Sequence, residues 1–172
     1  MGGGLGARPL YFKITNVSRG QIFMPINNHE LEFINGLNIL KPILVANNFK
    51  WIAGKSGVGS GGTFSSGKFL KRFLSSSNRS LEISYRFNLG LVIYTIGKNK
   101  LSHEDYMRVA AENNRNEYPG FSEEPAEGFE HLANDLKNFA QDFLTGTGEK
   151  FFMAIEEAEK RNKLSGFAKL NN

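Results

Sequence analysis

The sequence contains no cysteine among its 172 residues. This absence excludes a disulfide framework, a cysteine-ligated zinc or iron–sulfur site and a cysteine nucleophile. No apolar run approaches the roughly 18 residues that a membrane-spanning helix needs. The glycine-rich residues 1–9 lack the apolar core of a signal peptide. The sequence therefore predicts a cytoplasmic protein that does not enter a membrane.

Complete motifs for catalysis or cofactor binding are also missing. Residues 57–62 match the dinucleotide pattern GxGxxG, but neither a helix opening nor a βαβ repeat follows them. Gly54-Lys55-Ser56 resembles the end of a P-loop, yet Phe49 stands where that motif needs glycine. No GxSxG elbow exists, and His103-Glu104 lacks the second histidine of HExxH. We expect no cofactor and no metal, and the sequence favours a binding protein over an enzyme.

Acidic residues are scarce in the middle of the chain and abundant after it. Residues 50–100 hold nine Lys or Arg and a single acid, Glu82, which gives +8. Residues 101–159 hold four Lys or Arg and fourteen Asp or Glu, which gives −10. A basic stretch of this density can attract phosphate groups. Basic strands that lie beside acidic helices would instead neutralise each other, and both interpretations stay open.

Strand patterns dominate up to residue 97. Residues 10–26 read as two short strands, the segment from His29 to Gly36 alternates like a strand, and residues 43–46 form a short apolar run typical of a buried strand. Asn47-Asn48 predicts a tight turn. The best-defined unit is a β-hairpin of residues 81–87 and 91–96. Residues 68–74 fit a helix or a strand.

Helix patterns dominate after residue 97. Ser102 is a good N-cap for a helix over residues 103–113. A second helix from residue 123 and a third over residues 149–163 follow. The predicted apolar face of the second helix is Phe129, Leu132, Leu136, Phe139 and Phe143, and along the third helix Phe152, Ile155 and Glu159 lie in line.

Strands followed by helices predict an α+β fold. An antiparallel sheet from the first 100 or so residues would be covered by two or three C-terminal helices. We expect a flexible leader over residues 1–9, a single domain over residues 10–165 and a frayed tail over residues 166–172.

The most unusual stretch is residues 51–72, which holds six glycines, four serines, four Lys or Arg and no acid. In a loop, glycine N–H groups can converge on an anion, basic side chains add charge, and aromatic rings can stack on bases. The candidate ligand-binding residues are Trp51, Lys55, Gly57, Gly59, Gly61, Gly62, Phe64, Lys68, Lys71 and Arg72. The same stretch also fits a mobile hairpin tip anchored by its aromatic residues, or a flap that contacts protein.

Three functions follow as hypotheses. The first is a binding module for nucleic acid or another polyanion. The second is a protein-interaction or inhibitor domain, similar in general character to immunity proteins, which docks a basic partner on its acidic helices. The acids concerned are Glu123, Glu124, Glu127, Glu130, Asp135 and Asp142. The third is an enzyme with a site around Glu82, His103 and the glycine-rich stretch.

The histidines and Glu82 also have simpler structural interpretations. We expect His29, His103 and His131 on the surface, with His131 beside Glu127. Glu82 fits a cross-strand ion pair as well as a catalytic carboxylate. The sequence does not predict an oligomeric state.

Overall fold

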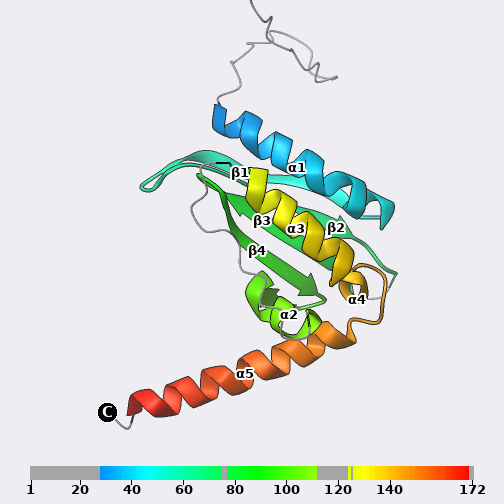
Figure 1. Cartoon of the computed structure of the whole chain (residues 1–172), viewed down its shortest axis with the longest axis vertical. Helices are drawn as coiled ribbons and strands as arrows, with labels where there is room; N and C mark the ends of the chain where they lie inside the picture. The colour runs from blue at the N-terminus through cyan, green and yellow to red at the C-terminus, as the bar shows by residue number, and fades with distance from the viewer. Residues whose placement is uncertain (1–27, 75–76, 112–123, 125, 171–172) are drawn as a thin grey trace, which may run out of the picture.

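The chain folds as five strands with helices before and after them. The computed structural model describes residues 28–74, 77–111, 124 and 126–170, with the side chains of residues 164–170 left out. The elements are α1 (Asn28–Ala46), β1 (Lys50–Gly59), β2 (Gly62–Lys71), β3 (Arg79–Tyr85), β4 (Leu89–Ile96), β5 (Asn99–Ser102), α2 (His103–Ala110), α3 (Ala126–Asn138), α4 (Gln141–Leu144) and α5 (Glu149–Leu170) (Figure 1). The expected α+β class, an antiparallel sheet with C-terminal helices, is confirmed.

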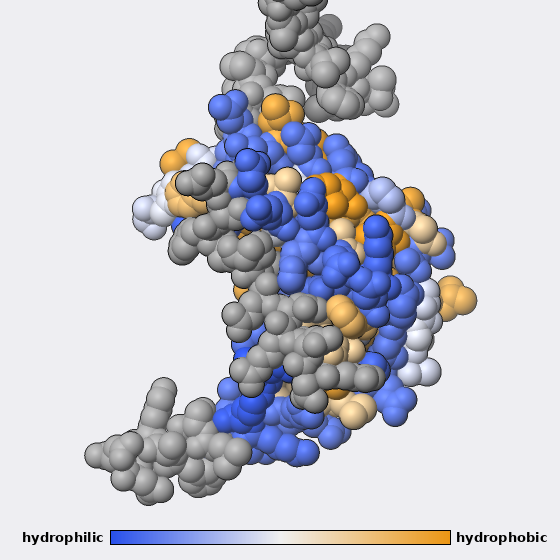
Figure 2. Space-filling model, viewed as in Figure 1, coloured by the Kyte–Doolittle hydropathy of each residue, from blue (hydrophilic) through white to orange (hydrophobic). Residues whose placement is uncertain are grey.

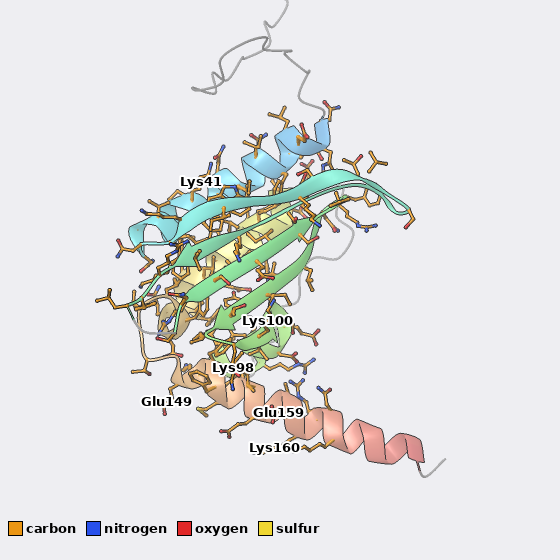
Figure 3. The ribbon with its side chains drawn as sticks, turned by 180° about the vertical axis from the view of Figure 1, so that it is seen from behind. Lys41, Lys98, Lys100, Glu149, Glu159 and Lys160 are labelled. Carbon is orange, nitrogen blue, oxygen red and sulfur yellow. The ribbon has the colours of Figure 1, made fainter. Side chains whose placement is uncertain are left out.

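The strands form one antiparallel meander in the order β1-β2-β3-β4-β5. Helices α1 and α3 lie together across one face, and the view from behind shows the strands in front of them (Figures 1 and 3). Successive residues of a strand point to opposite faces. The cross-strand row that faces the helices is Trp51, Phe69, Leu81, Tyr94 and Leu101. The neighbouring row, which points away from them, is Lys50, Leu70, Ser80, Thr95 and Lys100. We call this second side the open face, because none of the described helices lies across it.

Aromatic side chains fill the core between the sheet and the helices. Phe33, Tyr85 and Phe129 meet with ring centroids 5.7–6.3 Å apart. Farther along the sheet, Tyr94 and Phe143 meet edge to face at 4.8 Å. Outside the core, the helix side is mostly hydrophilic, with hydrophobic patches over α1 and α3 (Figure 2). None of the described helices is both long enough and apolar enough to cross a bilayer.

Local sequence signals gave several elements correctly. The hairpin β3–β4 pairs in register, with Leu81 opposite Tyr94. The tight turn is present, since Asn48 adopts a left-handed φ of 66°. Ser102 caps α2 by accepting a hydrogen bond from the Asp105 N–H at 3.1 Å. The predicted strands in residues 10–26 and the leader lie outside the described residues.

The strands predicted between residues 29 and 46 are wrong, because this segment is the 19-residue helix α1. Its buried residues Phe33, Leu37, Leu40 and Leu44 recur at helical spacing, which outweighs the short alternation around Leu31. Gly36 does not end the segment. A Cβ at this position would lie 2.3 Å from the Phe129 ring, so glycine is needed where α1 meets α3.

Two further expectations need correction. The glycine-rich stretch is the hairpin β1–β2 rather than a loop, and residues 68–71 belong to β2. In α5 the buried side chains are Phe151 and Ala154, whereas Phe152 is 40% exposed. The buried side of α5 is therefore offset by one residue from the predicted line of Phe152, Ile155 and Glu159. The apolar stripe from Phe129 to Phe143 is divided between α3 and α4.

Candidate functional site

The glycine-rich stretch forms a hairpin of two ten-residue strands, with Gly59 paired to Gly62 at its tip. The register shifts between Ala53 and Ser56. At this bulge the Ser66 hydroxyl accepts from the Lys55 N–H at 3.1 Å and donates to the Lys55 carbonyl at 2.9 Å. Glycines in paired strands place their N–H groups along the sheet rather than around one anion. The basic side chains are therefore the stronger candidates for binding an anion.

The aromatic candidates do not form a stacking platform. Trp51 packs on the helix side, with its ring centroid 4.8 Å from that of the buried Phe69 and 6.0 Å from that of Phe33. Gly67 lies under the indole, where a Cβ would come within 2.3 Å of it. Phe64 is partly buried, beside Gly57 and Gly59 of the opposite strand. Trp51 therefore packs against the core. Of these two aromatic candidates, only Phe64 lies near the open face.

Lys71 has a structural role. Its Nζ donates to the Leu144 carbonyl at 2.8 Å, and its cross-strand partner Arg79 donates to the carbonyls of Phe143 at 2.5 Å and Gly146 at 2.7 Å. Burial lowers the pKa of Lys71, and the neighbouring Arg79 lowers it further. These two cations hold the carbonyls at the end of α4 against the sheet. Arg72, in contrast, is exposed just beyond β2.

The open face carries a shallow groove of about 380 Å³. Lys55 and Lys68, both predicted site residues, line it together with Glu82. Aliphatic and hydroxyl side chains, among them Ile52, Ser66, Ser84, Leu91 and Ile93, make up most of the rest of the lining. Lys68 lies opposite Glu82 in the β2–β3 register, and the Glu82 carboxylate is 3.5 Å from Lys100 Nζ. The groove thus combines the exposed Lys55, the half-buried Lys68, one carboxylate and an apolar floor.

Most bases of the sheet have no acidic partner among the described residues. Of the nine in residues 50–100, Lys100 pairs with Glu82, and Lys71 and Arg79 bind carbonyls. No ion pair in the described ranges joins a base of the sheet to an acid of the helices. The bases without an acidic partner are Lys50, Lys55, Lys68, Arg72, Arg86 and Lys98, and all except the half-buried Lys68 are exposed. Burial lowers the pKa of Arg79 and the nearby Asp142 of α4 raises it, so the helices balance part of the positive charge of the sheet without a direct ion pair.

The acidic helices offer a smaller charged surface than the sequence suggested. Asp135 is fully buried. Asp142 accepts hydrogen bonds from the N–H groups of Gly148 and Lys150, both at 3.0 Å, and so caps α5. Glu123 lies outside the described residues. Glu124, Glu127 and Glu130 remain exposed.

The surface position expected for His103 is wrong, whereas His131 lies partly exposed beside an acid. His103 is 2% exposed, and its Nε2 lies 2.9 Å from Asp135 Oδ2. His131 Nε2 lies 3.2 Å from the same oxygen, so its partner is Asp135. His29 is only half-buried, with its ring 4.9 Å from that of Tyr85. His103 sits on the helix side and Glu82 in the open-face groove, so the fold does not bring them into one site.

Comparisons of the chain with protein-family models, with curated proteins and with solved structures find no match.

Proposed function

We propose that the protein binds a polyanion, specifically a nucleic-acid strand, on the open face of its sheet. The observation that carries this proposal is the set of bases around the groove that lack an acidic partner in the described residues. Uncompensated lysines on one face create a positive potential that attracts phosphate groups. Lys55 and Lys68 would contact phosphates at the groove, while Lys50 and Lys100 lie at the two ends of a row that crosses the sheet.

The dimensions of the sheet suit an extended strand. Neighbouring β-strands lie about 4.8 Å apart, so the row from Lys50 to Lys100 spans roughly 19 Å. The aliphatic side chains of Ile52 and Ile93 can contact sugars or bases between the phosphates. Since Trp51 and Phe69 face the core, Phe64 is the one predicted aromatic residue left for base stacking on this face. We therefore expect affinity that depends mainly on the phosphates, with weak sequence preference and a steep dependence on salt.

Fluorescence anisotropy tests this proposal. A labelled single-stranded oligonucleotide, as DNA and as RNA, is titrated with the full chain at several salt concentrations. The variant Lys55→Gln/Lys68→Gln should bind more weakly. Its slope of log affinity against log salt should fall by about 1.4, because each phosphate contact in a single strand contributes roughly 0.7.

The matched control is Lys160→Gln/Lys163→Gln, which removes the same charge from exposed positions of α5, where Lys160 is labelled in Figure 3. This variant should keep the wild-type affinity and slope. The proposal fails if the wild type does not bind at low salt. Equal losses in both variants would mean that net charge, and not the groove, attracts the nucleic acid.

A further inference from the structure

A buried polar network on the helix side joins three elements. The Tyr94 hydroxyl of β4 lies 3.0 Å from Nδ1 of His103 at the start of α2. The other ring nitrogen of His103 is 2.9 Å from Asp135 Oδ2 of α3, and Asp135 is fully buried. His131, one turn earlier in α3, reaches the same carboxylate oxygen at 3.2 Å and is 28% exposed. Asp135 thus connects α2 to α3 through His103.

The hydrogen-bond partners of the two ring nitrogens indicate which nitrogen of His103 carries the proton. A carboxylate only accepts, so His103 Nε2 must carry the hydrogen that binds Asp135. Nδ1 then accepts from the Tyr94 hydroxyl, and burial keeps Tyr94 protonated by raising its pKa. In this state the His103 ring is neutral, and its two nitrogens are hydrogen-bonded to Tyr94 and Asp135. A second proton on Nδ1 would remove the acceptor that Tyr94 uses and would add a buried charge.

Several charged groups on the surrounding elements bind other partners, and α3 also carries the exposed Glu127, Glu130 and Lys137. Arg161 of α5 binds Asp105 at 2.8 Å, and Lys150 of α5 donates to the Ala110 carbonyl. Asp142 of α4 caps α5, and on α2 Glu104 pairs with Arg108. Tyr106 of α2 packs its ring 4.8 Å from that of Tyr94. Besides burial, the Coulombic effect of His131 lowers the pKa of His103, because it opposes a second positive charge there.

A metal site does not explain the network. Within the described residues, no group of three or more His, Asp or Glu is arranged to hold a metal ion. His103 Nε2 is hydrogen-bonded to Asp135 Oδ2 at 2.9 Å, and His131 Nε2 lies within ion-pair distance of the same oxygen, at 3.2 Å. Proton uptake is the chemistry that this arrangement favours.

We propose that His103, Asp135 and Tyr94 form an acid-sensitive lock between α2 and α3, which opens when His103 takes up a second proton. This inference goes beyond polyanion binding, since the lock lies on the opposite side of the sheet from the groove. Burial lowers the pKa of His103 below its usual 6.5, so the unfolded chain holds more protons than the folded chain near that pH. The stabilisation is complete above about pH 6.5 and is lost as pH falls toward the lowered value.

Urea unfolding of the full chain between about pH 7.5 and pH 5.5 tests the lock. The wild-type midpoint should fall with pH. For each unit by which the His103 pKa lies below 6.5, the folded-to-unfolded ratio should drop by about tenfold. His103→Gln should show a much flatter pH dependence. His29→Gln, which removes a histidine on α1 outside the network, should retain the wild-type loss.

Hydrogen exchange, corrected for its intrinsic pH dependence, should locate the opening in α2 and α3. If His103→Gln does not fold, His131→Gln serves as the second variant. Removing His131 removes the charge that opposes protonation of His103, so this variant should lose less stability in acid than the wild type. The lock is overturned if the wild-type midpoint does not change with pH, or if the variants that fold lose as much stability as the wild type.

Discussion

Glu82 is the residue whose role depends most on what the groove binds. It is the single acid in residues 50–100, it lies opposite Lys68, and it pairs with Lys100 at 3.5 Å. In a polyanion-binding groove this carboxylate repels the ligand, although it also keeps Lys100 in place. In a groove that binds a cation, the same carboxylate would be the main contact. A single substitution therefore distinguishes the two kinds of ligand.

We predict that Glu82→Gln raises the affinity for a single-stranded oligonucleotide about two- to fivefold, because an exposed charge interaction contributes roughly 0.2–1 kcal/mol. Anisotropy at low salt measures the change. The control Glu159→Gln removes an exposed acid from α5, away from the sheet (Figure 3), and should leave the affinity unchanged. A weaker interaction in Glu82→Gln would contradict the proposed polyanion and would point to a cationic ligand.

At the scale of elements, the crossing of α1 and α3 depends on a missing side chain. Gly36 is buried in α1, and the ring of Phe129 occupies the space beside it. That ring is fully buried and also packs against Phe33 and Tyr85, so it has little freedom to move. Close packing of this kind makes the position sensitive to a single added methyl group.

We predict that Gly36→Ala destabilises the fold by about 1–2 kcal/mol. Overpacking costs roughly 1–3 kcal/mol, and the better helix propensity of alanine offsets up to about 1 kcal/mol of it. Urea unfolding measures the difference. The neighbouring exposed residue gives the control Asn35→Ala, which should stay within about 0.5 kcal/mol of the wild type. Unchanged or higher stability of Gly36→Ala would show that Phe129 does not pack tightly against this glycine.

Elements set by neighbouring residues were predictable, and elements set by distant partners were not. The β3–β4 hairpin and the Ser102 cap follow from a few adjacent side chains. Helix α1 was missed because Gly36 reads as a breaker until Phe129 is placed beside it. The burial of His103 depends on Asp135, 32 positions later. Lys55 and Lys68 could be identified by their charge alone. The role of Lys71, which donates to the Leu144 carbonyl, could not be predicted because α4 is distant from it in the sequence.

In the whole molecule, the sheet lies between the lysines of the groove on one side and the histidine network on the other. The open face carries lysines around a groove with no histidine in its lining. The helix side carries the buried network of His103, His131 and Asp135. Binding on one side and acid sensitivity on the other therefore involve different titrating groups. The two properties should vary independently when pH changes.

We predict that oligonucleotide affinity stays constant within about twofold between pH 8 and pH 6, while the stability of the fold decreases. Histidine is the side chain whose ordinary pKa places its charge change in this interval, and none lines the groove. At physiological ionic strength the screening length is about 8 Å, so protonated histidines behind the sheet add little attraction. Anisotropy at matched ionic strength measures the affinity, and circular dichroism confirms that the chain is folded at both pH values. If affinity instead rose in acid for the wild type but not for His103→Gln, the network would be coupled through the sheet to the groove, and the two faces would not act independently.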